Sequence, residues 1–305
     1  MQLQQLLGNE RFKTALAPFF RDNFPQSVIL EGGEGLGKRT AAFAIACNLM
    51  CTGPHPPCGV CGACVRMAAG SHPDYRLFNE EGGNIKVDDI RQIRRLSFIR
   101  PSEAQQKVFV INGASRMNPQ AQNALLKVLE EPQETVFILL CEQAQQLLQT
   151  VRSRCVRFSL DELPAGLIGQ ELRRRHPAAD PAQVEAALQR CGGSLGKALA
   201  RLESGPGRQE SLAADFVAAL GKSELNVLET CLKAAALPRD EFALFCNECC
   251  VQLWGAARQD PAQGWVLPLY DHLRELSART EGNASVSALS GELAAYCGNL
   301  LFARG

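Results

Sequence analysis

Residues 27–40 of this 305-residue chain read Ser-Val-Ile-Leu-Glu-Gly-Gly-Glu-Gly-Leu-Gly-Lys-Arg-Thr, and this stretch decides the fold. The apolar start predicts a buried strand, and residues 40–50 predict the helix that follows. A Gly-x4-Gly-Lys turn between a strand and a helix wraps phosphate groups in backbone N–H donors. Gly32, Gly37 and Lys38 are all in place. We therefore expect a phosphate loop and a nucleotide-type α/β domain.

The loop lacks the groups that would make it an ATPase. Arg39 stands where a Ser or Thr would hold Mg²⁺, and Thr40 comes one position late, which turns it about 100° away on a helix. The next core strand, 107–111, ends in Asn112 instead of carboxylates that hold the metal shell and polarise water. Glu142 follows the strand after it and is a weak substitute for a polar phosphate sensor. The sequence predicts a phosphate cradle without hydrolysis, and leaves ATP or ADP binding and a relic loop both open.

Four cysteines follow the loop at spacings of six, two and two residues: Cys51, Cys58, Cys61 and Cys64. Two-residue gaps let successive thiolates turn onto one metal, and four thiolates complete a closed tetrahedral Zn²⁺ shell with a structural role. Free thiols or a redox pair are the alternatives, but a redox pair does not need four cysteines. His55 and His72 would each be a fifth ligand, so we expect both to be loop residues.

The first half of the chain alternates apolar runs with helical patterns. Strands are predicted at 27–30, 75–78, 107–111, 135–140 and 156–160. Helices are predicted at 87–96 and 120–131. This alternation predicts a parallel sheet with helices on both faces.

After Leu160 only helical patterns remain, interrupted by short joints. Three domains are therefore predicted: an α/β domain at 1–161 with the cysteine knuckle inserted at 51–64, a small helical domain at 162–204, and a C-terminal helical domain at 208–305.

The composition of the chain disfavours some classes of function. Lys plus Arg and Asp plus Glu both number 32, whereas a free-standing nucleic-acid binder usually carries a basic excess. A zinc-dependent DNA-binding protein is therefore disfavoured. No apolar signal region and no apolar stretch of about 18 residues is present, so we expect a soluble, cytoplasmic protein without a membrane partner. Cys246, Cys249 and Cys250 lie in a helical pattern and are expected to be buried free thiols.

Four further segments follow the loop and the knuckle in order: Ser71-His-Pro-Asp74, Ile85-x-Val-Asp88-x-Ile-Arg91, Asn123-Ala-Leu-Leu-Lys-Val-Leu-Glu-Glu-Pro132 and Ser153-Arg154-Cys155. Together these motifs resemble the bacterial DNA polymerase III clamp loader subunits of the AAA+ type, over about residues 30–200. The resemblance implies an AAA+ P-loop domain, a small three-helix lid domain and a C-terminal all-helical collar for oligomerisation. The C-terminal third matches only in its helical character.

Within this family the chain departs from the gamma/tau motor subunits in three places. The motors carry a Ser or Thr after the loop Lys, an Asp-Glu pair on the following strand, and a Gly-Ser-x-Arg sequence in the lid. Here the corresponding residues are Arg39, Asn112 and Gly196, the last within Gly193-Ser194-Leu195-Gly196. The resemblance therefore implies the delta-prime, or stator, type of subunit without ATPase activity of its own. An active gamma/tau-type ATPase is the alternative, which the retained Lys38 keeps open.

The resemblance also assigns a role to Ser153-Arg154-Cys155, which is similar to the segment that delivers an arginine finger to the ATP of a neighbouring subunit. A guanidinium is permanently charged and can bridge γ-phosphate oxygens in the transition state. The alternative is an ordinary surface arginine that pairs with a local carboxylate. The place of Arg154 between two strand patterns favours the finger.

The implied partners are gamma/tau and delta subunits in a hetero-oligomer, the sliding clamp and primed DNA. Lys127 and the group Arg91, Arg94 and Arg95 could approach DNA phosphates. A solvated helix face is the favoured alternative for these four side chains.

Overall fold

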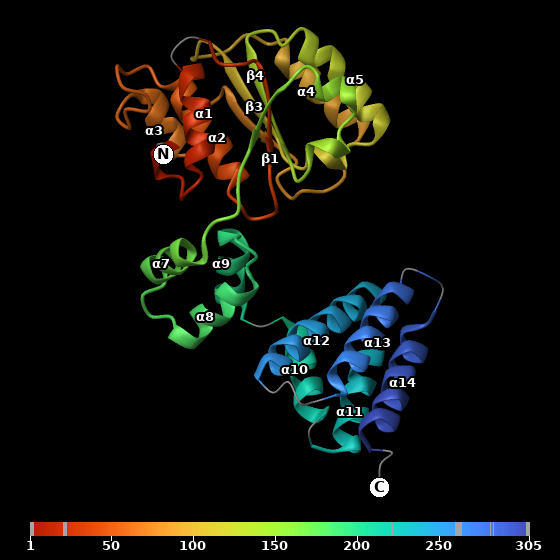
Figure 1. Ribbon diagram of the computed structural model, residues 1–305. Coiled ribbons are helices and arrows are strands. Elements are labelled where there is room, and N and C mark those ends of the chain that lie inside the picture. Colours follow the sequence, from red (N-terminus) through yellow and green to blue (C-terminus); the bar gives the residue numbers. More distant parts are fainter. Residues whose placement is uncertain are drawn as a thin grey trace. The chain divides into compact units, whose positions relative to one another are not determined.

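The computed structural model describes residues 3–20, 23–205, 207–220, 222–259, 264–280, 282 and 284–302. The chain divides into two compact units, Met1–Glu203 and Ser204–Gly305. The first contains a sheet covered by helices and then three small helices. The second contains helices only, as Figure 1 shows.

The sheet of the first unit has five parallel strands. Their spatial order is β2 (Tyr75–Phe78), β3 (Lys107–Ile111), β4 (Thr135–Cys141), β1 (Ser27–Glu31) and β5 (Val156–Ser159). Each predicted strand is confirmed to within one residue, because β-branched and aromatic runs suit a buried parallel sheet. The loop after β1 therefore emerges between β4 and β5.

Alternate residues of the central strands face opposite layers of helices. Val28 and Leu30 pack with α1 (Glu10–Leu16) and α2 (Lys38–Met50), whereas Ile29 faces the other side. Figure 1 shows α1, α2 and α3 (Gly62–Ala68) on one face of the sheet. The opposite face is covered by α4 (Val87–Ser97) and α5 (Pro119–Glu130). Short helical segments complete both layers. On the α1 and α2 face these are η1 (Leu3–Gln5) and η2 (Ala17–Phe20), and on the α4 and α5 face they are η3 (Ala114–Arg116), η4 (Ala144–Gln146) and α6 (Gln149–Arg152).

The helix after the phosphate loop begins at Lys38 and not at Thr40 as predicted. Gly37 has a φ of 90°, a left-handed conformation that glycine adopts without strain, and it ends the loop one residue before Lys38. Lys38 and Arg39 therefore belong to the first turn of α2.

Three small helices complete the first unit: α7 (Ala165–Arg175), α8 (Pro181–Arg190) and α9 (Leu195–Ser204). They share a separate small apolar cluster that includes Ile168, Leu172 and Val184. We refer to α7–α9 as the lid. The boundary between the lid and the α/β part stays a prediction, since the compact-unit division keeps them together.

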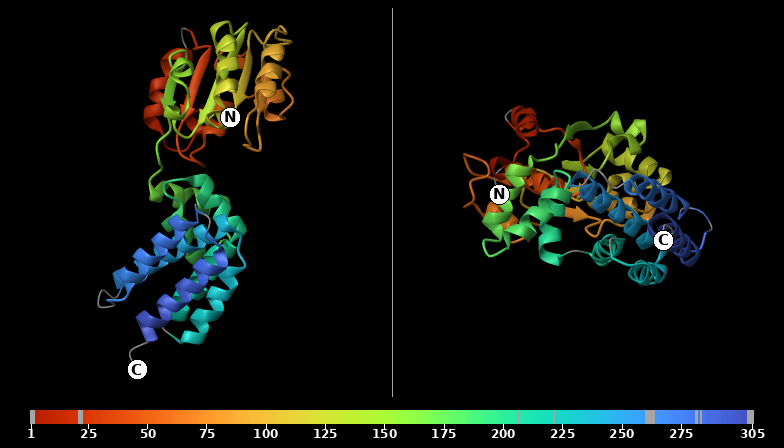
Figure 2. Two further views of the ribbon diagram at one scale, coloured as in Figure 1. Left: turned by 90° about the vertical axis from the view of Figure 1, so that its right-hand side faces the viewer. Right: turned by 60° about the horizontal axis from the view of Figure 1, so that its bottom comes forward.

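The second unit is built from α10 (Arg208–Leu220), α11 (Glu224–Ala235), α12 (Arg239–Gln259), α13 (Val266–Arg279), α14 (Val286–Cys297) and the π-helical turn η5 (Gly298–Phe302). These helices lie side by side in the views of Figure 2. Cys246, Cys249 and Cys250 are buried in its core as free thiols. Among the described helices of both units, none is long and apolar enough to cross a membrane.

Candidate functional site

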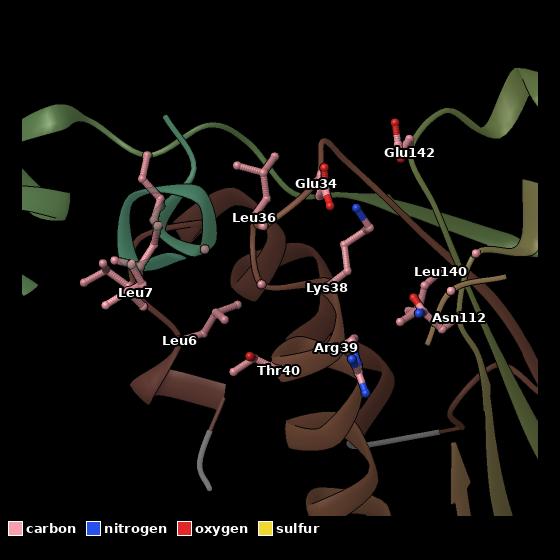
Figure 3. A pocket seen from close by; sticks show the side chains of 18 of the residues that line it. Leu6, Leu7, Glu34, Leu36, Lys38, Arg39, Thr40, Asn112, Leu140 and Glu142 are labelled. Atoms are coloured by element: carbon pink, nitrogen blue, oxygen red, sulfur yellow. The ribbon is translucent and has the colours of Figure 1, made fainter. Parts of the chain in front are cut away.

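The phosphate loop lies at the carboxyl end of β1 and lines a cavity of about 740 Å³. The other walls come from the amino-terminal segment at Leu6 and Leu7, the ends of β3 and β4, and the lid. Figure 3 shows these parts around the start of α2. A cavity of this size can hold a nucleotide-sized ligand.

Lys38 is turned back onto its own loop. Its ammonium donates hydrogen bonds to the carbonyl oxygens of Gly32 at 2.5 Å and Gly33 at 2.7 Å. Burial lowers the pKa of Lys38, and the nearby Glu142, Cys141 and Glu34 oppose that shift. The charge that would contact β and γ phosphates is thus satisfied within the loop itself.

Arg39 occupies the position of the missing hydroxyl. Its guanidinium donates to the Glu80 carboxylate at 2.9 Å, and both residues line the cavity. Thr40 also lines the cavity, but Figure 3 shows Lys38, Arg39 and Thr40 projecting in different directions from the first turn of α2. Consequently an ion-paired guanidinium takes the sequence position at which a hydroxyl would bind Mg²⁺.

Asn112 follows β3 and is engaged in a reciprocal contact with Asn79. The Asn112 side chain donates to the Asn79 carbonyl at 3.1 Å, and the Asn79 side chain donates to the Asn112 carbonyl at 2.9 Å. Glu142, which follows β4, lines the cavity. Among the residues described, this leaves no acidic pair at the end of β3 that could hold a metal shell.

The lid touches the loop through two glycines. The Gly196 N–H donates to the Gly35 carbonyl at 2.9 Å. A Cβ on Gly196 would lie 2.7 Å from the Gly35 Cα, and a Cβ on Gly35 would lie 2.3 Å from the Ser194 hydroxyl. Gly196 is the position where the motor subunits were expected to carry an arginine. Because neither glycine has a side chain, the backbones of the lid and the phosphate loop can approach each other this closely.

The four predicted zinc ligands come together. The sulfur atoms of Cys51, Cys58, Cys61 and Cys64 all lie within 4.8 Å of one another. Backbone N–H groups also point at these sulfurs: those of Cys58 and Gly53 donate to Cys51 at 3.2 and 3.3 Å. Hydrogen bonds from the backbone of Cys64 and from Thr52 lower the pKa of Cys61 to about 5. The residues fit a tetrahedral thiolate site for a metal ion.

His55 and His72 lie in loops, as expected, but His72 is buried. Its Nδ1 accepts a hydrogen bond from the Asp74 backbone at 3.2 Å. Neither histidine belongs to the group of four cysteines, the one metal-ligand group found among the described residues.

Two buried charges shape the segment between α4 and β3. The Asp74 carboxylate accepts backbone N–H bonds from Ser102, Glu103 and Ala104 at 2.7–2.9 Å. Burial would raise the pKa of Asp74, but these three donors lower it overall. The Lys107 ammonium donates to three carbonyls at the end of α4: those of Leu96, Ser97 and Ile99.

This anchored segment presents apolar side chains to solvent beside basic ones. Phe98 and Ile99 are 54% and 61% exposed. The Arg94 guanidinium lies over the Phe98 ring at 5.7 Å, and Arg91 and Arg95 line the same shallow depression. We call these five residues the α4 patch.

Arg154 lies in the turn between α6 and β5. Its guanidinium donates to the Glu130 carboxylate at 2.6 Å and to the Thr150 carbonyl at 2.9 Å. Arg154 is not among the described residues that line the chain's own cavity. Ser153 donates to the same Thr150 carbonyl, and Cys155 packs against the core, where burial raises its pKa to about 12. The Arg154 guanidinium is thus bonded at the surface, outside the lining of this chain's own cavity.

Sequence comparison gives the family. Residues 9–164, just over half of the chain, match the family described as DNA polymerase III, delta subunit. The chain belongs to this family. Among the curated members it resembles, the DNA polymerase III subunit delta' of Pseudomonas aeruginosa is 37% identical over 180 residues, which cover 57% of this chain and 55% of the relative. That of Bacillus subtilis is 36% identical over 154 residues, 50% of this chain and 47% of the relative.

Tau/gamma subunits are also among the curated proteins that the chain resembles. The tau/gamma subunit of Haemophilus influenzae is 32% identical over 191 residues, 60% of this chain and 28% of the relative. The chain thus spans about half the length of the delta' relatives it matches, and less of the tau/gamma relative. A crystal structure of a DNA polymerase III gamma subunit-related protein from Thermotoga maritima has the same fold, with a TM-score of 0.50 at 17% identity over 94% of this chain and 98% of that one.

Several residues of the site were not foreseen. The contact between Lys38 and its own loop, the approach of Gly35 to Gly196, and the pairing of Arg154 with Glu130 all join groups whose interaction has no sequence signature. The Gly-Ser-x-Gly departure in the lid was the one available hint, and it indicated only a lost arginine.

Proposed function

We propose that this chain is a non-hydrolysing, delta-prime type subunit of a cytoplasmic clamp loader. In this role it helps to place the sliding clamp on primed DNA and donates Arg154 to the ATP of a neighbouring subunit. One observation carries the proposal. The three positions that would hold Mg²⁺, polarise water and supply the lid arginine are Arg39, Asn112 and Gly196, and each is committed to another contact.

The chemistry of hydrolysis explains why this matters. Phosphoryl transfer is catalysed mainly by a correctly positioned metal ion and by electrostatic stabilisation of the transition state. The protein contributes little covalent chemistry. Arg39 repels a divalent cation, and the Asn112 amide carries no charge to hold one. We therefore infer that nucleotide bound in the cavity would stay intact.

The location of Arg154 supports a role in trans. The side chain is 36% exposed on a turn outside the chain's own cavity, where a second subunit can reach it. The two terminal nitrogens of a guanidinium match phosphate oxygens in a bidentate geometry. Ser153 and Cys155 fix the turn on either side of it.

The second unit supplies a surface for assembly with gamma/tau-type and delta-type subunits. Leu225, Leu228 and Leu232 recur along α11 at helical spacing and are exposed. Exposed apolar stripes of this kind mark protein interfaces. We propose that this leucine stripe packs against a neighbouring collar helix.

The α4 patch is our proposed contact with primed DNA or the clamp. Its arginines suit phosphate oxygens, and Phe98 offers an aromatic face. Lys127 is exposed on α5, which packs against α4. Zn²⁺ on the four cysteines is proposed to be structural, since all four thiolates are needed to close the shell.

An active gamma/tau-type ATPase is the second candidate, favoured by the retained Lys38 and the open cavity. ATP turnover distinguishes the two. The isolated chain should hydrolyse no ATP, whereas a mixture with its gamma/tau-type partner should exceed the partner alone, and Arg154→Ala should remove that gain. Turnover by the isolated chain that Lys38→Ala abolishes would establish the ATPase instead.

A further inference from the structure

The guanidinium of Arg154 is held on this chain's own surface by one carboxylate. Its Nη2 lies 2.6 Å from Glu130 Oε1, and its Nη1 donates to the Thr150 carbonyl. The two side chains are 36% and 49% exposed, so both are open to a second molecule. The same nitrogens that would bind a phosphate are therefore already bonded within the chain.

Glu130 stands at an unfavourable place for a carboxylate. It is the last residue of α5, and the carboxyl end of a helix carries a partial negative charge that repels anions. The helix gains nothing from Glu130 unless a cation neutralises it. Arg154 is that cation, which points to a role for Glu130 directed at Arg154 and not at the helix.

We propose that Glu130 is a positioning residue that holds Arg154 in a resting place until a phosphate of the neighbouring subunit's nucleotide competes for it. This inference rests on the proposed role of Arg154 in trans. A carboxylate and a phosphate oxygen compete for the same N–H donors. A nucleotide phosphate carries more negative charge than one carboxylate, so it displaces Glu130 once the subunits meet.

The strength of the contact suits such a competition. Exposed ion pairs are worth about 0.2–1 kcal/mol, which corresponds to about 1.4-fold to fivefold in an equilibrium. This contact biases Arg154 toward the resting position without blocking its release. It also keeps the guanidinium from other anions before assembly.

The test uses four full-length variants, each reconstituted with its gamma/tau-type and delta-type partners: Glu130→Gln, Arg154→Ala, the double variant, and Glu131→Gln as the matched control at the next residue. We expect Glu130→Gln to raise kcat/KM for ATP by about 1.4-fold to fivefold. The control should match the unaltered protein. In the double variant the gain should vanish, because no guanidinium remains to be released. Raising the salt concentration should shrink the gain, since salt screens an exposed pair.

The outcomes distinguish failure of the proposed function from failure of the resting-place role of Glu130. If Arg154→Ala leaves kcat/KM unchanged, the proposed function fails and this inference fails with it. If Arg154→Ala lowers kcat/KM but Glu130→Gln leaves it unchanged or lowers it, only the resting-place role of Glu130 is overturned. A gain that persists in the double variant overturns it as well, since the effect would then not act through Arg154.

Discussion

Gly196 of the lid and Gly35 of the phosphate loop touch backbone to backbone. The Gly196 N–H donates to the Gly35 carbonyl at 2.9 Å, and a Cβ on Gly196 would meet the Gly35 Cα at 2.7 Å. Contacts this short exclude any side chain at either position unless the backbone moves. The lid is thus fastened to the loop by a direct backbone contact.

The glycine contact can be tested by adding one carbon. Gly196→Ala should lower the free energy of unfolding by about 1–3 kcal/mol, as overpacking of a tight site does. Gly166→Ala in α7 is the matched control, because nothing lies within 4 Å of a Cβ there. Urea denaturation of the full chain measures both. Equal stability of the two variants would contradict the close approach.

Loss of the Arg154 guanidinium should lower the ATPase activity of the assembled subunits and leave the stability of the isolated chain nearly unchanged. Arg154→Ala removes only exposed contacts, so its unfolding free energy should change by less than about 1 kcal/mol. At the ATP site that Arg154 is proposed to serve, kcat should fall by about a thousandfold, the lower range for an arginine finger. Arg173→Ala, an exposed arginine of α7 outside the cavity lining, is the control. An unchanged DNA-stimulated ATPase rate would remove Arg154 from the mechanism.

The cysteine cluster predicts about one metal ion per chain. Cys58→Ser should lose the metal, since a thiolate is one of four ligands in the shell. Elemental analysis of the purified protein measures the content directly. Cys191→Ala, a buried cysteine of the lid core, should retain it. If the purified protein contained no metal and still had normal thermal stability, the predicted metal site would be refuted.

The Asp74 carboxylate predicts a pH dependence of stability. Its pKa is lowered in the folded protein, so its contribution is complete above the ordinary value of 3.8 and is lost as the pH falls through the lowered value. Asp74→Asn should cost about 1–3 kcal/mol at pH 7, because backbone donors lose an ionised acceptor. The gap from the unaltered protein should narrow at acidic pH. Asp88→Asn, exposed on α4, is the control for unfolding measured from pH 7 to pH 2.

The leucine stripe on α11 predicts a loss of assembly without a loss of folding. Leu232→Glu places a charge on a side chain that is 65% exposed, so the isolated chain should unfold at its usual temperature. Leu267→Glu, on an exposed position of α13, is the control. Size-exclusion chromatography with gamma/tau-type partners reads out complex formation. Full assembly of the Leu232 variant would show that the collar uses another face.

The sequence was most informative where the fold depends on local patterns. The strands at 107–111 and 135–141 are runs of β-branched and aromatic residues, and the loop glycines mark where the chain turns. The boundaries of α2, α4 and α5 lie one or two residues from the predicted ones, and at α2 the left-handed conformation of Gly37 decides where the helix begins.

The contacts that define the site could not be predicted in the same way. A long side chain such as Lys38 can reach several acceptors, and only the folded backbone determines which of them lie near. In this structure Lys38 bonds to carbonyls of its own loop. The surface pairing of Arg154 was anticipated as an alternative, but its partner Glu130 lies on another helix and has no sequence signature. Pairings between distant segments depend on the tertiary arrangement.

The ion pair between Arg39 and Glu80 has an evolutionary consequence. Replacing Arg39 with Ser would introduce a hydroxyl but leave Glu80 without its cation, and Asn112 and Gly196 would still offer neither a carboxylate nor an arginine. An arginine at Gly196 would also collide with Gly35. Any one of these changes alone would thus leave the other two positions unsuited to hydrolysis. We expect descendants of this chain to drift further from hydrolysis, because no single step toward it confers an advantage.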